Sequence, residues 1–168
     1  MFSSLTDLGF SLLVTFDLPA LFALFVLKGA IIGKPFPTSV FLPGYIAVSP
    51  SQESIWLVIL VASIGYVSGQ LVIYWLAATR GVDVIHAIPR VSISDEQLEQ
   101  ANDVFKRYSG AGIFVTNLVP YVGSFVMIPA GIARYSIRRA TVYAFTSTLL
   151  NYVAIVWIVF GSLELLLP

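Results

Sequence analysis

Four long stretches of the chain contain no Asp, Glu, Lys or Arg and consist mainly of apolar residues. They cover residues 35–52, 54–79, 110–133 and 140–163. A helix needs about 20 apolar residues to cross the hydrocarbon core of a bilayer. Only 11% of the 168 residues are charged, whereas soluble domains carry about 25%. The sequence therefore predicts an integral, multi-pass membrane protein without a substantial soluble domain.

The residue types that the chain lacks argue against several functions. Nine basic and nine acidic residues give no net charge, so we expect no nucleic acid partner. There is no cysteine, and the single histidine, His86, has only Asp83 at ligand spacing, so we expect no metal and no cofactor. Because no motif for a catalytic nucleophile, a zinc site or a phosphate loop is present, we do not expect an enzyme.

The N-terminal segment has no basic region and carries Asp7 and Asp17, so we assign it to the mature protein rather than to a signal peptide.

The chain repeats itself once. Residues 40–47 (VFLPGYIA) line up with residues 126–133 (VMIPAGIA), and their prolines coincide. At the same offset, the apolar stretch after Glu53 falls on the one after Arg139. The alternative is a chance match between apolar segments, but duplicated halves of opposite orientation are a recurring transporter design. We predict an all-α polytopic membrane fold of two inverted pseudo-repeats, each a re-entrant helical hairpin followed by a long transmembrane helix.

The whole chain is predicted to form one membrane domain. Repeat 1 covers about residues 1–80, a cytoplasmic loop with a surface helix about residues 81–108, and repeat 2 about residues 109–168. The surface helix begins with a capping box of Ser94 and Gln97. Its apolar stripe favours a position on the membrane or against the bundle, and it consists of Leu98, Ala101, Phe105 and Tyr108. Residues 6–18 are its candidate counterpart in repeat 1.

The charge-free segment of residues 110–133 is predicted to enter and leave the membrane by the same face. Its glycines and prolines break a helix or free backbone groups. Seven of the nine basic residues flank it, and basic flanks stay on the cytoplasmic side. These residues are Arg80, Arg90, Lys106 and Arg107 before it, and Arg134, Arg138 and Arg139 after it. We therefore place one hairpin tip near residues 117–123 and, by the repeat, another at residues 34–39, with the tips meeting near the midplane.

Two lysines lie in otherwise apolar sequence and are candidate ligands for an anionic headgroup. A lysine at the bilayer centre costs roughly 2.5 to 3.5 kcal/mol, so Lys28 and Lys34 are expected to face a polar path. Alternatively, their flexible stems let the ammonium groups reach the interface. The complete predicted substrate pathway is Lys28, Lys34, Pro35, Pro37, Ser39, Asn117, Pro120 and Gly123.

Other polar and small residues have two interpretations each. Asp17 is either a proton carrier or the cap of the helix that Pro19 begins. The polar side chains of the tips either bind substrate or satisfy carbonyls freed by the prolines; they are Ser39, Asn117 and Ser124. Gly65 and Gly69 form a small-residue face on which another helix packs closely. His86 is interpreted as an interfacial residue rather than a base or ligand.

Several short motifs make the chain similar to the DedA family, also called the SNARE-associated or VTT-domain family, over nearly its whole length. These motifs are Pro35-Phe-Pro37 before Pro43-Gly44, Gly65-x3-Gly69-x4-Tyr74 with Arg80-Gly81, and Phe114, Pro120 and Pro129-Ala-Gly131. The resemblance implies two oppositely facing re-entrant hairpins. It also implies movement of lipids, such as polyisoprenyl phosphates or phosphatidylethanolamine, in some members with the proton motive force.

The chain departs from the family pattern at charged positions. Acidic residues of the first hairpin align with Lys28 and Ser39, and arginines of the second align with Asn117 and Gly123. The resemblance therefore does not extend to proton coupling or to arginine-based phosphate binding, and Lys28 and Lys34 are the candidates to restore a positive charge from the opposite hairpin.

Our leading hypothesis is a lipid translocase or scramblase that moves a phospholipid or polyisoprenyl-phosphate headgroup between leaflets. The alternatives are a proton-coupled transporter of a small solute, a non-transporting membrane assembly protein, or a membrane enzyme with His86 as its base. We expect membrane lipids as partners, the plasma membrane as location, and a chain that is compatible with a homo-oligomer.

Overall fold

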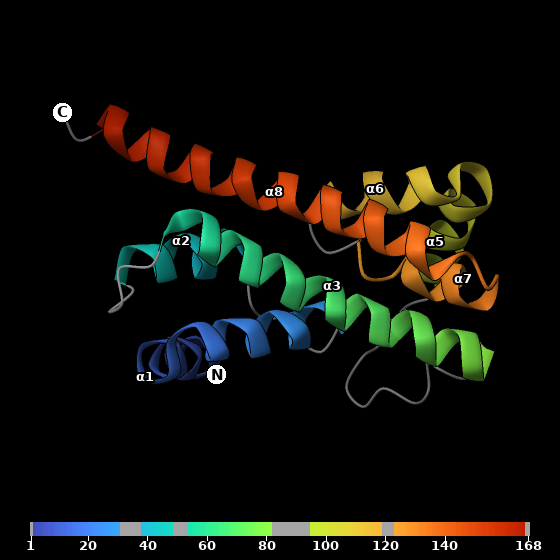
Figure 1. Cartoon of the computed structure of the whole chain (residues 1–168), viewed down its shortest axis with the longest axis horizontal. Helices are drawn as coiled ribbons and strands as arrows, with labels where there is room; N and C mark the ends of the chain where they lie inside the picture. The colour runs from blue at the N-terminus through green and yellow to red at the C-terminus, as the bar shows by residue number, and fades with distance from the viewer. Residues whose placement is uncertain (1, 31–37, 49–53, 82–94, 119–122, 167–168) are drawn as a thin grey trace.

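The computed structural model describes residues 2–30, 38–48, 54–81, 95–118 and 123–166. Within these ranges all regular structure is helical and no strand occurs, so the all-α prediction is confirmed. The helices are α1 (Phe2–Gly29), α2 (Thr38–Val48), α3 (Ile55–Arg80), α5 (Asp95–Tyr108), α6 (Gly110–Leu118), α7 (Met127–Ile132) and α8 (Ile137–Leu166). Figure 1 shows them arranged around the two longest unbroken helices, α3 and α8, which run side by side in opposite directions.

The two long helices arise from two of the charge-free stretches. The α3 helix begins where the Ser54 hydroxyl accepts a hydrogen bond from the Leu57 amide (3.2 Å), and it ends at Gly81, whose φ of 62° suits glycine. By length and composition, three segments of the described chain can cross a membrane: Ser11–Gly29, Ile55–Arg80 and Ile137–Ser162. The prediction of a multi-pass membrane protein is confirmed.

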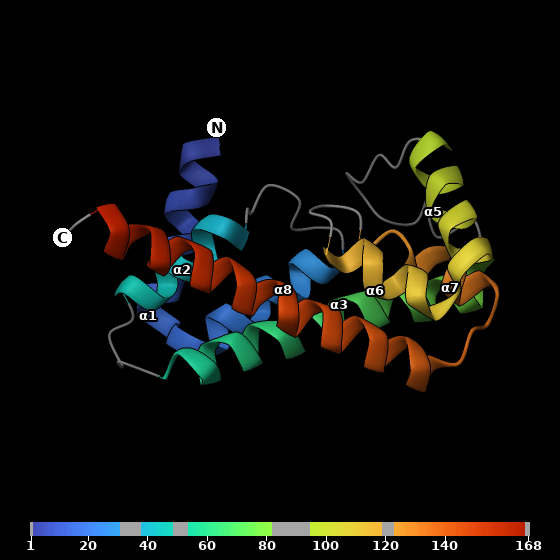
Figure 2. The same ribbon diagram turned by 90° about the horizontal axis from the view of Figure 1, so that it is seen from above.

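The first of these segments is broken. Asp17 has φ 53° and ψ −133° inside α1, a conformation in which a residue with a Cβ is strained. Pro19 lies in the first turn of the helical part that follows Asp17. Backbone N–H groups in a first helical turn have no partner within the helix, and proline has no N–H group to leave unpaired. Figure 2 shows the part before the break pointing away from the long axis, while the part after it follows α3. At 1.5 Å per residue, residues 18–29 extend about 18 Å.

The α5 helix lies across the opposite end of the molecule (Figure 2). It is the predicted surface helix, although residues 90–94 lie outside the described part of the chain. Phe105 is buried and meets the Tyr135 ring edge-on, with centroids 5.6 Å apart, so α5 packs against the bundle. Tyr108, on the same predicted stripe, is 52% exposed, and its ring lies beside the Arg107 guanidinium (5.4 Å).

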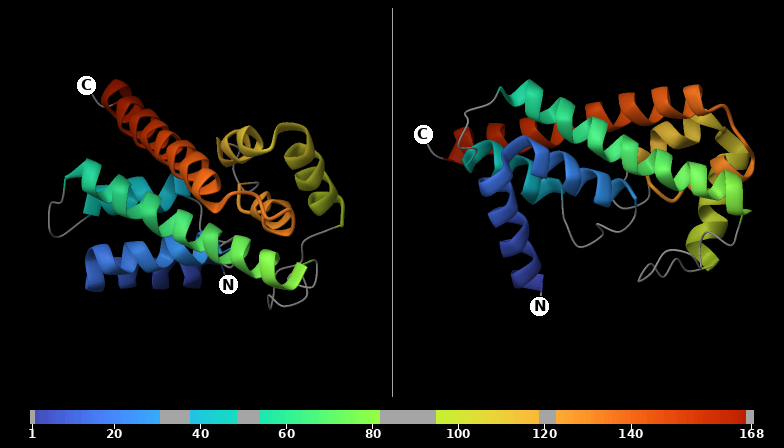
Figure 3. Two further views of the ribbon diagram at one scale, coloured as in Figure 1. Left: turned by 45° about the vertical axis from the view of Figure 1, so that its right-hand side comes forward. Right: turned by 60° about the horizontal axis from the view of Figure 1, so that its bottom comes forward.

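Each long helix contacts short helices from both ends of the sequence. The α1 helix packs along α3 and the α6 helix along α8, whereas α2 contacts mainly α8 and α7 contacts mainly α3 (Figures 1 and 3). Two buried clusters follow from this arrangement. One joins α1, α2, the first part of α3 and the later part of α8; the other joins the second part of α3 to α5, α6, α7 and the start of α8.

The contact between α1 and α3 is a close approach of two backbones. A Cβ added to Gly65 would lie 2.7 Å from the Phe22 carbonyl oxygen. A Cβ on Gly69 would collide with the Val26 carbonyl oxygen, and one on Gly29 with the Tyr66 carbonyl oxygen. No side chain fits at these three positions, as is typical of packed membrane helices.

Candidate functional site

Polar side chains gather at the middle of α3, the depth at which a membrane offers them no water. Gln70 is fully buried and its Nε2 donates a hydrogen bond to Asn117 Oδ1 of α6 (2.7 Å). Asn117 Nδ2 in turn donates to Ser147 Oγ of α8 (3.1 Å). The side chain of Asn151, one turn further along α8, donates to the Asn117 backbone carbonyl (2.8 Å). Asn117 therefore connects three helices.

Gly123 lies directly against this network. A Cβ at Gly123 would collide with Asn117 Oδ1, so Gly123 lies close to the end of α6. Beyond Gly123, Ser124 is buried and its hydroxyl is 3.2 Å from the Tyr66 hydroxyl of α3, at hydrogen-bond distance. The second half of the chain thus contributes Asn117 and Ser124 to one polar cluster around α3.

Lys28 approaches the same cluster from the first half of the chain. It occupies the last turn of α1, and its Nζ lies 5.7 Å from the centroid of the Phe25 ring and 5.8 Å from that of Tyr66. Cation–π attraction of this kind stabilises an ammonium group away from water. Tyr66 therefore contacts the Lys28 cation with its ring and Ser124 with its hydroxyl. We call Lys28, Tyr66, Gln70, Asn117 and Ser124 the central cluster.

A third aromatic ring closes one side of the central cluster. Tyr152 of α8 packs edge-on against Phe25 with centroids 5.4 Å apart, and against Tyr66 at 6.1 Å. One turn earlier on α8, Thr148 is buried and its hydroxyl oxygen has no hydrogen-bond partner within the described part of the chain.

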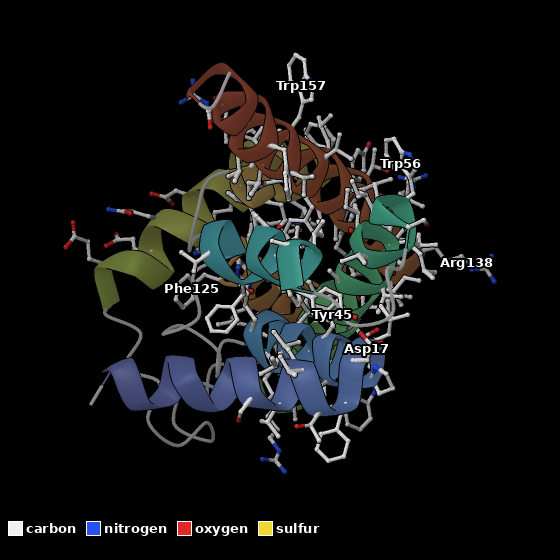
Figure 4. The ribbon with its side chains drawn as sticks, turned by 90° about the vertical axis from the view of Figure 1, so that its left-hand side faces the viewer. Asp17, Tyr45, Trp56, Phe125, Arg138 and Trp157 are labelled. Atoms are coloured by element: carbon white, nitrogen blue, oxygen red, sulfur yellow. The ribbon has the colours of Figure 1, made fainter. Side chains whose placement is uncertain are left out.

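Asp17 lies away from the central cluster, at the break in α1. Its carboxylate accepts a hydrogen bond from the hydroxyl of Tyr45, a buried residue of α2. Figure 4, seen along the molecule from this end, shows the two side chains facing each other. The bond joins α1 to α2.

The structure brings together only some of the residues that the sequence singled out. Asn117 and Gly123 lie against each other, and Lys28 is linked to them through Tyr66. Gly65 and Gly69 lie on the α1–α3 contact, and Asp17 lies apart. Ser39 is in α2, but its side chain is not described. Four of the predicted pathway residues, and His86, fall outside the described part of the chain: Lys34, Pro35, Pro37 and Pro120.

Four residues of the site were not singled out from the sequence: Tyr66, Gln70, Ser147 and Asn151. Gln70 and Asn151 carried a usable signal, because each is an isolated amide in a charge-free apolar stretch, where polar groups need a partner. Among the described residues, no group of three or more His, Cys, Asp or Glu is placed to hold a metal ion.

Comparison with known proteins gives one family and several distant relatives. Residues 35–163 match the model of the VTT domain. The uncharacterized membrane protein YkoX of Bacillus subtilis is 29% identical over 116 residues, 67% of this chain and 52% of that protein. Undecaprenyl phosphate transporter A of Staphylococcus aureus is 25% identical over 138 residues, 79% of this chain and 68% of that protein.

An uncharacterized membrane protein of Haemophilus influenzae is also similar, with 28% identity over 145 residues, 83% of this chain and 68% of that protein. The matched part of the chain thus spans about half the length of YkoX and about two thirds of the other two relatives. No solved structure matches the chain.

Proposed function

The chain belongs to the VTT-domain, or DedA, family, and from this we propose that it moves the phosphate-bearing headgroup of a lipid between the two leaflets of its membrane. A distant relative bears the name undecaprenyl phosphate transporter A, which supports a lipid carrying a phosphate as the substrate class. In this proposal the headgroup passes the central cluster while its acyl chains stay in the bilayer.

The proposed path runs between two re-entrant hairpins. Residues 18–29 and α2 form the first, and α6 and α7 form the second. The break at Asp17 supports the first, because the arm after it extends about 18 Å, roughly half of a 30 Å hydrocarbon core. The short lengths of α6 (9 residues) and α7 (6 residues) support the second.

The two halves are proposed to be inverted repeats. Their packing supports this relation, since each long helix holds the first arm of its own half and the second arm of the other half. The offset that aligns residues 40–47 with residues 126–133 also places Tyr66 on Tyr152. These two tyrosines are neighbours at the centre of the molecule, with ring centroids 6.1 Å apart, as residues beside a pseudo-two-fold axis would be.

The observation that carries the proposal is the position of Lys28. Its ammonium group lies beside Tyr66, near the middle of the 26-residue α3 helix, at the depth where an intramembrane cation is most costly. The other residues of the central cluster come from both halves and offer donors rather than further charges. A phosphate group entering the cluster would replace the weak attraction of the rings for Lys28 by an ion pair.

The surrounding hydroxyls and amides would then complete the binding of the phosphate oxygens. The Tyr66 and Ser124 hydroxyls bond each other in the closed cluster (3.2 Å), and the exchange of this bond for bonds to phosphate would open the contact between the halves. Asn117 and Gly123 stand where the resemblance implies arginines, and Asn117 is engaged with Gln70 and Ser147. Lys28 therefore supplies the positive charge from the opposite hairpin.

The test is transbilayer movement in liposomes that contain the purified chain. Labelled phosphatidylethanolamine, phosphatidylglycerol and a polyprenyl phosphate should be compared, and at least one should move faster than in empty liposomes. Lys28→Met should slow this movement about tenfold or more, because one charge-assisted bond is lost. Lys106→Met, on the exposed end of α5, is the matched control and should leave the rate unchanged. Rates equal to those of empty liposomes for every headgroup would refute the proposal.

A second function, proton-coupled transport of a small solute, is favoured by the carboxylate of Asp17. It lies within an apolar helix and is bound by a buried tyrosine, as a group that takes up and releases a proton in a membrane would be. Asp17→Asn should then abolish the pH dependence of solute uptake, whereas unchanged pH dependence would rule this function out.

A further inference from the structure

Six of the nine basic residues lie at one end of the molecule, which we call the basic end. They are Arg80, Lys106, Arg107, Arg134, Arg138 and Arg139, and all are exposed. Tyr135 holds their elements together: its ring meets Phe105 of α5, and its carbonyl accepts a hydrogen bond from the Tyr74 hydroxyl of α3. Figure 1 shows the ends of α3 and α5 and the start of α8 at this end of the molecule.

Three of these cations are placed where helices favour them. Arg80 is in the last turn of α3, and Lys106 and Arg107 are in the last turn of α5, where the helix dipole is negative. Of the other three, Arg138 and Arg139 lie in the first turn of α8, where the dipole repels cations, and Arg134 lies in the turn between α7 and α8. We call this second group, Arg134, Arg138 and Arg139, the arginine turn. Within the described part of the chain no carboxylate pairs with any of its members.

The backbone of Arg134 adds to this cost. Its φ is 49°, in the left-handed region. The amides of Arg134 and Tyr135 donate to the carbonyls of Gly131 (2.9 Å) and Ala130 (3.0 Å), which is the helix-ending motif whose left-handed position is usually glycine. An arginine therefore occupies a position where the backbone favours glycine. We expect a function of the guanidinium group to offset this backbone cost.

The surface beside the arginine turn is apolar. Ile137 is 45% exposed and Val142 is 63% exposed, and the membrane-length stretch of α8 starts at Ile137. The guanidinium groups consequently lie where an apolar surface ends, at the depth of lipid headgroups. Planar guanidinium groups bind phosphate oxygens in pairs, and clusters of cations beside a membrane span bind anionic lipids.

We infer that the arginine turn is a binding site for the phosphate group of an anionic phospholipid in the leaflet that it faces. An anion there would neutralise two cations that the α8 dipole disfavours and a third, Arg134, whose backbone position favours glycine. The site is separate from the central cluster, and its occupation does not depend on lipid movement. If anionic lipid were attracted only by a general excess of cations on one side of the membrane, the arginine turn and the other three cations of the basic end would contribute equally. The experiment therefore compares the contributions of these two groups to lipid binding.

The experiment titrates phosphatidylglycerol into the full chain in detergent and follows the rise of the thermal unfolding midpoint. Phosphatidylcholine and soluble glycerol phosphate serve as ligand controls and should give no rise. The variant Arg134→Asn/Arg138→Gln/Arg139→Gln should need on the order of 100-fold more phosphatidylglycerol for half of the effect, since three cations are lost. The charge-matched variant Arg80→Gln/Lys106→Gln/Arg107→Gln should need less than about tenfold more.

The single variant Arg134→Gly separates binding from folding. It should raise the unfolding midpoint of the lipid-free chain, because the strain is relieved, and yet weaken the response to phosphatidylglycerol roughly fivefold to tenfold. Three results would each overturn the inference. The first is an equal loss of phosphatidylglycerol affinity in the two triple variants. The others are a response to phosphatidylcholine or glycerol phosphate as large as that to phosphatidylglycerol, and an unchanged response of Arg134→Gly.

Discussion

The two halves of the molecule hold their first helix against their long, unbroken helix by different means. In the first half, α1 lies on α3 through glycines, and the backbones touch without intervening side chains. In the second half, α6 lies on α8 through amide and hydroxyl groups centred on Asn117. Inside a membrane both solutions are effective, because close packing and interhelical hydrogen bonds replace the hydrophobic effect that lipid cannot supply.

The difference teaches how the two contacts are expected to respond to change. A contact between two backbones is disrupted by any added side-chain atom. A hydrogen-bond network accepts side chains of another shape, but it is weakened when one hydrogen-bonding partner is removed. Both contacts end at the central cluster, where Lys28 comes from the first half and Asn117 from the second.

The largest effect is expected at the glycine contact. Gly69→Val would insert a branched side chain where even a Cβ collides with the Val26 carbonyl oxygen, so α1 must leave α3. We expect a loss of about 3 kcal/mol or more in the free energy of unfolding, measured by circular dichroism during SDS-induced unfolding. Gly161→Val in α8 is the matched control, because no atom lies within 4 Å of a Cβ at that position. Equal stability of the two variants would show that the contact is not a constraint.

A smaller effect is expected in the hydrogen-bond network. Asn117→Leu leaves the buried Gln70 amide without its partner, at a cost of about 2 kcal/mol. The double variant Gln70→Leu/Asn117→Leu removes both polar groups and should recover at least half of that loss. A double-mutant cycle by the same unfolding measurement gives the coupling between the two residues. A double variant whose loss equals the sum of the single losses would mean that the network does not join α3 to α6.

The smallest effect is expected at the outer end of the first half. Tyr45→Phe removes the hydroxyl that binds Asp17 and nothing else, which should lower the unfolding free energy by about 1 kcal/mol. Tyr143→Phe, at a more exposed position of α8, should cost less and serves as control. If the costs are the same, the break in α1 is held by its backbone and not by this bond.

Much of the fold could be predicted because bilayer thickness decides it. The charge-free stretch of residues 54–79 became α3 with boundaries one residue away, and that of residues 140–163 lies within α8. Periodicity and capping residues likewise indicated α5. These features are local, and each follows from the length of an apolar run or from the chemistry of a helix end.

The central cluster could be predicted only in part, because it depends on which faces of distant helices meet. Lys28 and Asn117 were found, since a lone cation and an amide between helix breakers are conspicuous in apolar sequence. Gln70 and Asn151 are as conspicuous, but nothing local says that both contact Asn117. Tyr66 resembles any other aromatic residue of a membrane helix until Lys28 and Ser124 are seen on either side of it.

The glycine contact between α1 and α3 also bears on the electrical properties of the membrane. Where the carbonyl oxygens of one helix touch the glycines of the other, no space remains for a chain of water molecules along that contact. Protons and small ions therefore have no route along this contact, although it ends at Lys28 of the central cluster. This contact therefore keeps its part of the barrier on which the membrane potential depends.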